Sequence, residues 1–491
     1  MDAATERRSA TYLSYTEARS VISGILLAMF LAALNQTIVA TALPTIGRDL
    51  HDFENLSWTV TAYLLTSTVV ASLYGKLSDI HGRRAMMLTA IGIFVVGSAI
   101  CALAPNMLTL VLGRGLQGLG GGGIMPLAQV VVADVSPPRD RGRYQAIIGI
   151  VWVGAGVGGP VIGGFIAEHL AWSLIFWINV PLGVGAAYLT NAALKRLPRN
   201  DRWHELDIVG AGVMMLGALA LLLALTWGGT RYPWVSPPIV GLLALALAFA
   251  VAFRWRIAIA AEPYLPLPIL RNPIVRMGAV TSACAVGASI GLTVFVPFYY
   301  QLVHKLSVGE SGLALIPIAV MTTPGSILAG RAMMYLRRYK RVSLIFLTVA
   351  IAAIVFLAVR PLSSPWIVMV VLALVGTGVG SVFPLATVCI QNAVEPHQLG
   401  IATGVMNFFR ALVAALMVAL MGAIMLAGFG VAPDGARAAG VLIAAGAAAG
   451  DAAHVFRWVF AAAAAFLVVG LIALIRLPER PLRGGSGRPV G

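Results

Sequence analysis

The chain has 491 residues, of which 59% are hydrophobic and only 11% are charged, and its mean hydropathy is +0.90. Charged residues make up about a quarter of an ordinary globular domain. The composition therefore excludes a soluble enzyme and indicates a protein that lies in a lipid bilayer. The formal net charge of +15 would suit a nucleic-acid partner only if the basic residues gathered on one water-exposed surface.

A helix that crosses the hydrocarbon core needs about 20 predominantly apolar residues. The sequence has fourteen such stretches and so predicts an all-α membrane protein with fourteen transmembrane helices. The predicted spans cover residues 20–43, 57–75, 85–104, 107–133, 144–167, 171–194, 206–227, 237–256, 275–299, 311–330, 342–359, 366–391, 402–427 and 455–475. A Gly/Ala-rich segment, Gly428 to Asp451, is too apolar for a plain loop, and its structure is left open.

Most of the 34 Lys and Arg residues fall in segments on the side of the N-terminus. Two arginines, Arg114 and Arg410, lie inside spans. The opposite side holds Arg48, Arg231, Lys305, Arg360, Arg437 and Arg457. The positive-inside rule then places both termini in the cytoplasm and predicts a multi-pass protein of the inner (cytoplasmic) membrane. Its partners are the bilayer and a small-molecule substrate, and no nucleic acid is expected.

An internal repeat with an offset of 258 residues relates the fourth span to the twelfth. The aligned pairs are Gly118 with Gly376, Gly120 with Gly378, Gly122 with Gly380, Pro126 with Pro384, Pro138 with Pro396 and Gly142 with Gly400. This repeat predicts two six-helix bundles, residues 1–195 and 266–491, with two inserted helices and their linkers at 196–265. The ionisable residues do not repeat, since Arg114 aligns with Leu372 and Asp134 with Asn392.

Arg114 is the charged residue placed deepest in a predicted span, at a cost of about 2.5 to 3.5 kcal/mol on insertion scales. It must therefore face partners or water, and Gln117 shares its helix face. The following glycines fit G-x-G-x-x-G, but no strand precedes them, so close helix packing explains them better than a dinucleotide site. No P-loop, cofactor motif or metal cluster is apparent, which leaves an ion gradient as the energy source.

Charged residues also mark the turn between the second and third spans, GKLSDIHGRR, which includes Gly75, Asp79, Gly82, Arg83 and Arg84. The glycines permit close approach, and Asp79 is expected to pair with a neighbouring helix. Asp134 ends the fourth span, where a carboxylate opposes the helix dipole and needs a cation such as Arg83 or Arg143. These residues predict a cytoplasmic gate. The alternative interpretation is a basic loop that only sets the topology and whose charges are exposed to water.

The fifth span contains GAGVGGPVIGG, with a kink expected at Pro160. Its glycines are Gly154, Gly156, Gly158, Gly159, Gly163 and Gly164. Such a run offers a flat face for close helix contact. The alternative interpretation is that the glycines serve only general helix packing and have no role in function.

The turn Gly75 to Arg84, LGRGLQGLGGG around Arg114, the fifth-span glycines and the first-span LNQTIVATALPTI together resemble the major facilitator superfamily. With fourteen spans, the chain is similar to the drug/proton antiporter branch of that family. The resemblance implies the major facilitator fold and alternating access. It also implies proton antiport and multidrug efflux, with Arg114 in proton coupling or substrate contact and Gln117 and Asn35 as polar contacts.

Asn35 departs from that branch, which usually has an aspartate there, and an asparagine cannot titrate. A dedicated metabolite or organic-anion exporter, or a facilitator without proton coupling, is therefore the alternative; a non-transporting sensor or enzyme is more remote. All nineteen acids map to loops, tails or span ends, so we expect neutral or anionic amphipathic substrates. Aromatic and polar residues expected to line the cavity include Tyr63, Trp152, Tyr299 and Asn407.

Overall fold

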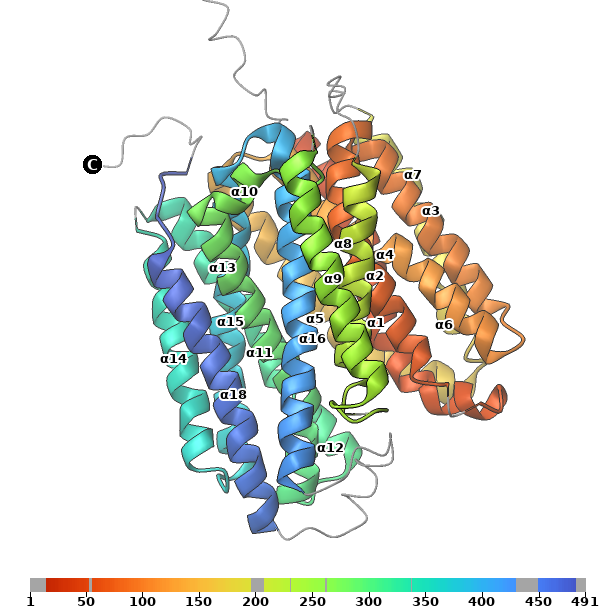
Figure 1. Ribbon diagram of the computed structural model, residues 1–491, viewed down its shortest axis with the longest axis vertical. Coiled ribbons are helices and arrows are strands. Elements are labelled where there is room, and N and C mark those ends of the chain that lie inside the picture. The colour runs from red at the N-terminus through yellow and green to blue at the C-terminus, as the bar shows by residue number, and fades with distance from the viewer. Residues whose placement is uncertain are drawn as a thin grey trace, which may run out of the picture.

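The structure is a computed structural model that describes residues 15–52, 55–195, 207–229, 231–260, 263–336, 338–429 and 449–482. Apolar helices dominate these residues (Figure 1). The helices are α1 (Tyr15–Asp49), α2 (Trp58–His81), α3 (Arg83–Ala102), α4 (Met107–Val135), α5 (Pro138–His169), α6 (Leu174–Trp177), α7 (Asn179–Leu194), α8 (Ile208–Trp227), α9 (Pro237–Ile259), α10 (Leu267–Arg271), α11 (Pro273–Val303), α12 (Val308–Leu313), α13 (Ile316–Tyr335), α14 (Lys340–Val359), α15 (Pro365–Ala393), α16 (Leu399–Gly428) and α18 (Ala449–Arg476).

Thirteen helices of the described residues are long and apolar enough to cross a membrane. The predicted second span, α2, is not among them, because Thr, Ser, Lys76 and Asp79 reduce its hydropathy. It is nevertheless 24 residues long and packs between α4 and α16 inside the bundle. With α2 included, the described residues contain the fourteen predicted spans.

Two predicted spans are broken near one end. The sixth consists of the short α6 followed by α7, and the tenth consists of α12 followed by α13. Pro181 and Pro317 lie in the first turns of α7 and α13. Proline is tolerated in a first turn, but it disfavours continuation of a preceding helix because it has no N–H to donate and its ring clashes with the carbonyl group four residues earlier. Most of the Gly428 to Asp451 segment, residues 430–448, lies outside the described residues.

The repeat is visible in how α4 and α15 pack. Gly118 and Gly122 of α4 face α2, and Gly120 faces α3. In the same way Gly376 and Gly380 of α15 face α13, and Gly378 faces α14. Each repeat therefore uses alternate glycines to bring one central helix against two neighbours.

The N-terminal helices and the C-terminal helices have separate apolar clusters. Two lie among α1 to α7, and a larger one lies among α11 to α18. The inserted helices α8 and α9 lie against each other, and α8 also contacts α2 and α16 (Figure 1). The division at residues 195 and 265 stays a prediction, and residues 196–206 lie outside the described ranges.

The two ends of the bundle differ in charge. We call the basic end the one where α2 turns into α3 and α4 into α5, near Arg83 and Arg143. The short helix α10 lies at this end in Figure 1, and α12 lies at the opposite end, which we call the outer end. The last described residues also dock at the basic end, where Lys340 Nζ donates to the carbonyl oxygen of Leu477 at 2.8 Å.

Candidate functional site

Arg114 lies at the centre of a buried polar network and is only 1% exposed. Its Nε donates to the Thr59 carbonyl oxygen at 2.8 Å, and its Nη1 donates to Gln117 Oε1 at 2.6 Å. The guanidinium carbon lies 4.5 Å from the centre of the Tyr63 ring, within the range of a cation–π contact. The buried cation is thus held by dipoles and an aromatic face.

The same network reaches Asn35. Gln117 Nε2 donates to Asn35 Oδ1 at 3.2 Å, and Asn179 Nδ2 donates to the same oxygen at 3.3 Å. Gln117 Nε2 also contacts Ser98 Oγ at 2.5 Å. The structure therefore brings Asn35, Arg114 and Gln117 together in one network, in which neutral side chains surround the Arg114 cation. Among the described residues no carboxylate forms an ion pair with Arg114.

At the basic end, Arg83 joins two carboxylates. Its Nη1 lies 2.5 Å from Asp79 Oδ1, and its Nε lies 2.8 Å from Asp134 Oδ2. Asp79 in turn accepts the backbone N–H groups of Gly400 and Ile401, at 3.1 and 3.0 Å, where α16 begins. Of the two cations expected beside Asp134, Arg83 forms an ion pair with it. Arg84 binds elsewhere, donating to Asn191 Oδ1 of α7 at 2.8 Å.

Two glycine pairs bring helices from the two repeats together at this end. A Cβ added to Gly75 of α2 would lie 2.8 Å from the Gly400 carbonyl carbon of α16. A Cβ added to Gly142 of α5 would lie 2.9 Å from Gly330 Cα of α13. Gly82 has a different use, since its φ of +90° turns the chain from α2 into α3. We call the two pairs the glycine contacts.

The fifth-span glycines fall into two groups. A Cβ on Gly159 would lie 3.1 Å from the Ile38 backbone nitrogen, and one on Gly163 would lie 2.5 Å from the Ile38 oxygen, so these two hold α5 against α1. Gly154 and Gly158 would make only ordinary contacts, and Gly164 faces open space. Close packing of helices therefore explains why Gly159 and Gly163 are glycines, but it does not require glycine at the other positions.

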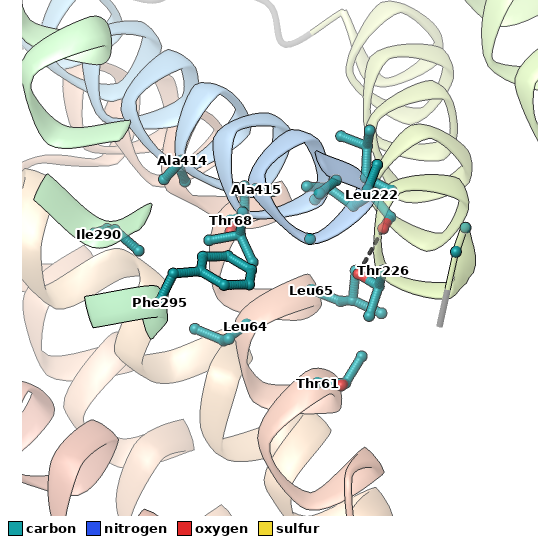
Figure 2. Close-up of a pocket in the computed structure, with 18 of the residues that line it drawn as sticks. Thr61, Leu64, Leu65, Thr68, Leu222, Thr226, Ile290, Phe295, Ala414 and Ala415 are labelled. Atoms are coloured by element: carbon teal, nitrogen blue, oxygen red, sulfur yellow. Dashed lines mark hydrogen bonds between the residues drawn. The ribbon is translucent and has the colours of Figure 1, made fainter. Parts of the chain in front are cut away.

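A pocket with a volume of about 550 Å³ opens between the helices of the two repeats. Figure 2 shows Thr61, Leu64, Leu65 and Thr68 of α2 on one wall, facing Phe295 of α11. Helices α8 and α16 complete the wall, and the lining reaches the turn after α8 at the outer end. Among the described residues no charged side chain lines the pocket, and its alkyl and aromatic groups are interspersed with hydroxyls. Its size suits a drug-sized molecule.

The four residues expected in the cavity do not line this pocket. Tyr63 is 1% exposed and faces α4, on the other side of α2. Tyr299 packs on Phe456 and donates its hydroxyl to the Pro361 carbonyl oxygen at 2.6 Å, so it belongs to the core of the C-terminal helices. Trp152 is exposed on α5, and Asn407 is partly buried against Gln129 of α4.

Asp207 at the start of α8 and Tyr264 in the linker after α9 make contacts that the sequence analysis missed. Asp207 caps α8 by accepting the Gly210 N–H at 2.9 Å, and it also pairs with Arg256 of α9 at 2.9 Å. Burial alone would raise the pKa of Asp207, but the hydrogen bonds from Gly210, Arg256 and Tyr264 outweigh it and hold the pKa below its usual value. The Tyr264 hydroxyl then donates to Ser72 Oγ of α2 at 3.0 Å. No periodicity predicts this link, because it joins a loop to distant helices.

The geometry has features of a membrane transporter. A drug-sized pocket between two helical repeats has a lining that reaches the outer end, and an ion network and glycine contacts join the helices at the opposite end. Within the described ranges, His, Cys, Asp and Glu nowhere gather in the groups of three that a metal site requires.

The comparisons with known proteins agree. The model of the Major Facilitator Superfamily matches residues 25–207 and 208–418, and the chain belongs to this family. It is 34% identical to the multidrug transporter protein MdtP of Bacillus subtilis over 82% of this chain and 75% of that one. It is also 29% identical to multidrug resistance protein 3 of Bacillus subtilis, over 86% of this chain and 81% of the relative.

Other relatives are longer. An uncharacterised MFS-type transporter of Mycobacterium tuberculosis is 35% identical over 85% of this chain, but the match covers only 61% of its own length. Among solved structures, the human organic anion transporter MFSD10 (TETRAN) is similar, with a TM-score of 0.66 and 16% identity over 94% of this chain and 99% of that one. At this identity the likeness shows the fold alone. The chain is therefore a multi-pass membrane transporter of the superfamily.

Proposed function

We propose that this transporter exports small amphipathic compounds across the cytoplasmic membrane by alternating access, with proton antiport as the driving force. The pocket between the repeats, whose lining reaches the outer end while the glycine contacts hold the basic end together, carries the proposal. In alternating access such a state releases substrate outward. The names of the Bacillus multidrug relatives support efflux of this substrate class.

The orientation rests on charge. Most Lys and Arg residues lie in the tails and in loops that join helices at the basic end, and by the positive-inside rule this supports a cytoplasmic location for that end and for both termini. The ion network of Asp79, Arg83 and Asp134 then acts as the cytoplasmic gate. Gly75 and Gly82 allow its helices to approach and turn, and Arg84 and Arg143 flank it.

For proton coupling, Arg114 is the central residue and Asn35 and Gln117 are its polar relay. The fifth-span glycines and Pro160 would allow α5 to move against α1, because only Gly159 and Gly163 are closely packed there. One proton moving down 100 mV yields about 2.3 kcal/mol, roughly a fifty-fold substrate gradient.

A second candidate is a facilitator or dedicated metabolite exporter without proton coupling. One observation favours it: Asn35 stands where two amide donors converge on a single oxygen, and the described network around it holds no acid. Such a network has no carboxylate to load and unload a proton.

Efflux from proteoliposomes with and without an imposed pH gradient separates the two candidates. The panel contains neutral, anionic and cationic fluorescent amphipaths, and the proteins are wild type, Asn35→Asp and Arg114→Ala. Proton antiport predicts acceleration by the gradient that is lost in Arg114→Ala. Gradient-independent transport that becomes gradient-dependent in Asn35→Asp would establish the facilitator, and wild-type vesicles that export no member of the panel would refute both.

A further inference from the structure

A second arginine, Arg410, is buried in the middle of α16 and is only 5% exposed. Its Nε donates to Ser282 Oγ of α11, its Nη2 to Thr387 Oγ1 of α15 at 3.1 Å, and its Nη1 to Asn407 Oδ1 at 3.4 Å. The Phe383 ring centre lies 5.1 Å from the guanidinium carbon. Arg410 therefore lies where α11, α15 and α16 meet.

The surroundings of Arg410 do not neutralise its charge. All three acceptors are neutral oxygens, and no carboxylate of the described residues forms an ion pair with it. An ionisable side chain within a membrane span is costly and usually marks a substrate or ion pathway. A guanidinium also has five N–H groups in a planar fork, so it can hold the two oxygens of an acidic group beyond these three bonds.

Gln129 of α4, in the other repeat, covers this cluster. Asn407 Nδ2 donates to Gln129 Oε1 at 2.9 Å, and Gln391 Nε2 donates to the Gln129 carbonyl oxygen at 3.2 Å. Ala411, the next residue after Arg410, and Ala414, one turn further along α16, line the pocket. The cluster thus lies between the pocket and the closed basic end. Separation of α4 from α16 at the basic end would break both contacts to Gln129 and open the side of Arg410 that faces Asn407.

We propose that Arg410, with Ser282 and Thr387, forms the subsite that binds the acidic group of anionic amphipathic substrates when the basic end is open. The apolar part of such a substrate occupies the neutral, alkyl-lined space of the pocket next to it. This inference rests on the proposed export function, which it deepens by naming the substrate charge and the residue that reads it. Arg410 is unlike Arg114, whose guanidinium is enclosed within the first repeat.

The test uses two probes with the same ring skeleton, anilinonaphthalene sulfonate, an anion, and N-phenylnaphthylamine, which is neutral. Binding of each to the purified full chain in detergent is measured by equilibrium dialysis against protein-free micelles. The variants are Arg410→Gln, Arg410→Lys and, as a matched control, Arg360→Gln, which removes an exposed arginine at the outer end. Transport of both probes is then measured in proteoliposomes.

We expect Arg410→Gln to weaken binding of the anion about ten- to a hundredfold, because a hydrogen bond to a charged group contributes about 1.5 to 3 kcal/mol. Binding of the neutral probe should stay within about twofold, Arg410→Lys should restore part of the loss, and Arg360→Gln should match wild type. An equal loss for both probes, unchanged anion binding in Arg410→Gln, or a wild type that binds only the neutral probe would overturn the inference. Arg410-dependent binding without transport of either probe would instead uphold the subsite and refute export.

Discussion

The glycine contact between α5 and α13 should control how often the basic end is closed. In the structure, a Cβ on Gly142 would lie 2.9 Å from Gly330 Cα and 3.0 Å from the Gly330 oxygen. Both neighbours are backbone atoms and cannot rotate away, so Gly142→Ala must push the two helices apart. Overpacking of this kind costs about 1 to 3 kcal/mol. The cost falls only on the closed basic end, so the equilibrium between outward-open and inward-open states should shift about 5- to 150-fold toward inward-open.

A cysteine placed on the pocket wall reports this shift. Thr68 lines the pocket, so the Thr68→Cys variant carries a reporter thiol on the pocket wall. The native cysteines Cys101, Cys284 and Cys389 are buried, so background labelling should be low. The rate of labelling by a membrane-impermeant maleimide added from the outer side follows the outward-open population. We expect Gly142→Ala to slow labelling of the reporter.

The matched control is Gly156→Ala on the same helix. A Cβ at Gly156 meets nothing within 4 Å, so this variant makes the same change in composition without the overlap. It should label at the rate of the parent protein. Equal rates for Gly142→Ala and the parent, or an equal slowing by Gly156→Ala, would refute the argument that this contact closes the basic end.

Three further perturbations test the charges and the linker. Asp79→Asn removes one of the two carboxylates that Arg83 joins and should slow the same pocket labelling; faster or unchanged labelling would count against the gate. Tyr264→Phe removes the bond to α2, worth about 0.5 to 1.5 kcal/mol, so the same assay should show slowing of no more than about tenfold, and a larger change would point to lost packing. Because hydrogen bonds hold the pKa of Asp207 low, its carboxylate stabilises the fold above its unfolded pKa of about 3.9, and this contribution is lost as the pH falls through the lower folded value. Asp207→Asn should therefore unfold at a lower temperature than wild type at neutral pH, with the gap closing in acid; a constant gap would show that charge is not the cause.

The membrane spans could be predicted because a span needs little more than length and hydropathy. Hydropathy alone excludes α2, because its polar residues make contacts inside the bundle and do not face lipid. The breaks before α7 and α13 depend on prolines in a first turn, a position that hydropathy does not detect. The short segment carrying Tyr264 was missed because its burial arises only from tertiary packing.

For the site, sequence spacing predicted neighbours along one helix better than neighbours across the bundle. Gln117 three residues after Arg114 had to share its face, and the structure places them in contact. Tyr299 looked like a cavity residue, yet its ring completes an aromatic core with Phe456. Arg410 stood out only as a charge within a span, because Ser282 comes from a helix far away in the sequence.

The two glycine contacts are related by the internal repeat. Gly142 and Gly400 occupy equivalent positions, and each meets a glycine of the opposite repeat; at the second contact Asp79 also accepts the backbone N–H groups of Gly400 and Ile401. The contact between α2 and α16 at the basic end is therefore held by hydrogen bonds as well as by close packing. When that end does open, the parting should start along the seam of α5 and α13 and reach the side of α2 and α16 last, so that the first entrance for a substrate is a one-sided crevice rather than a symmetric mouth.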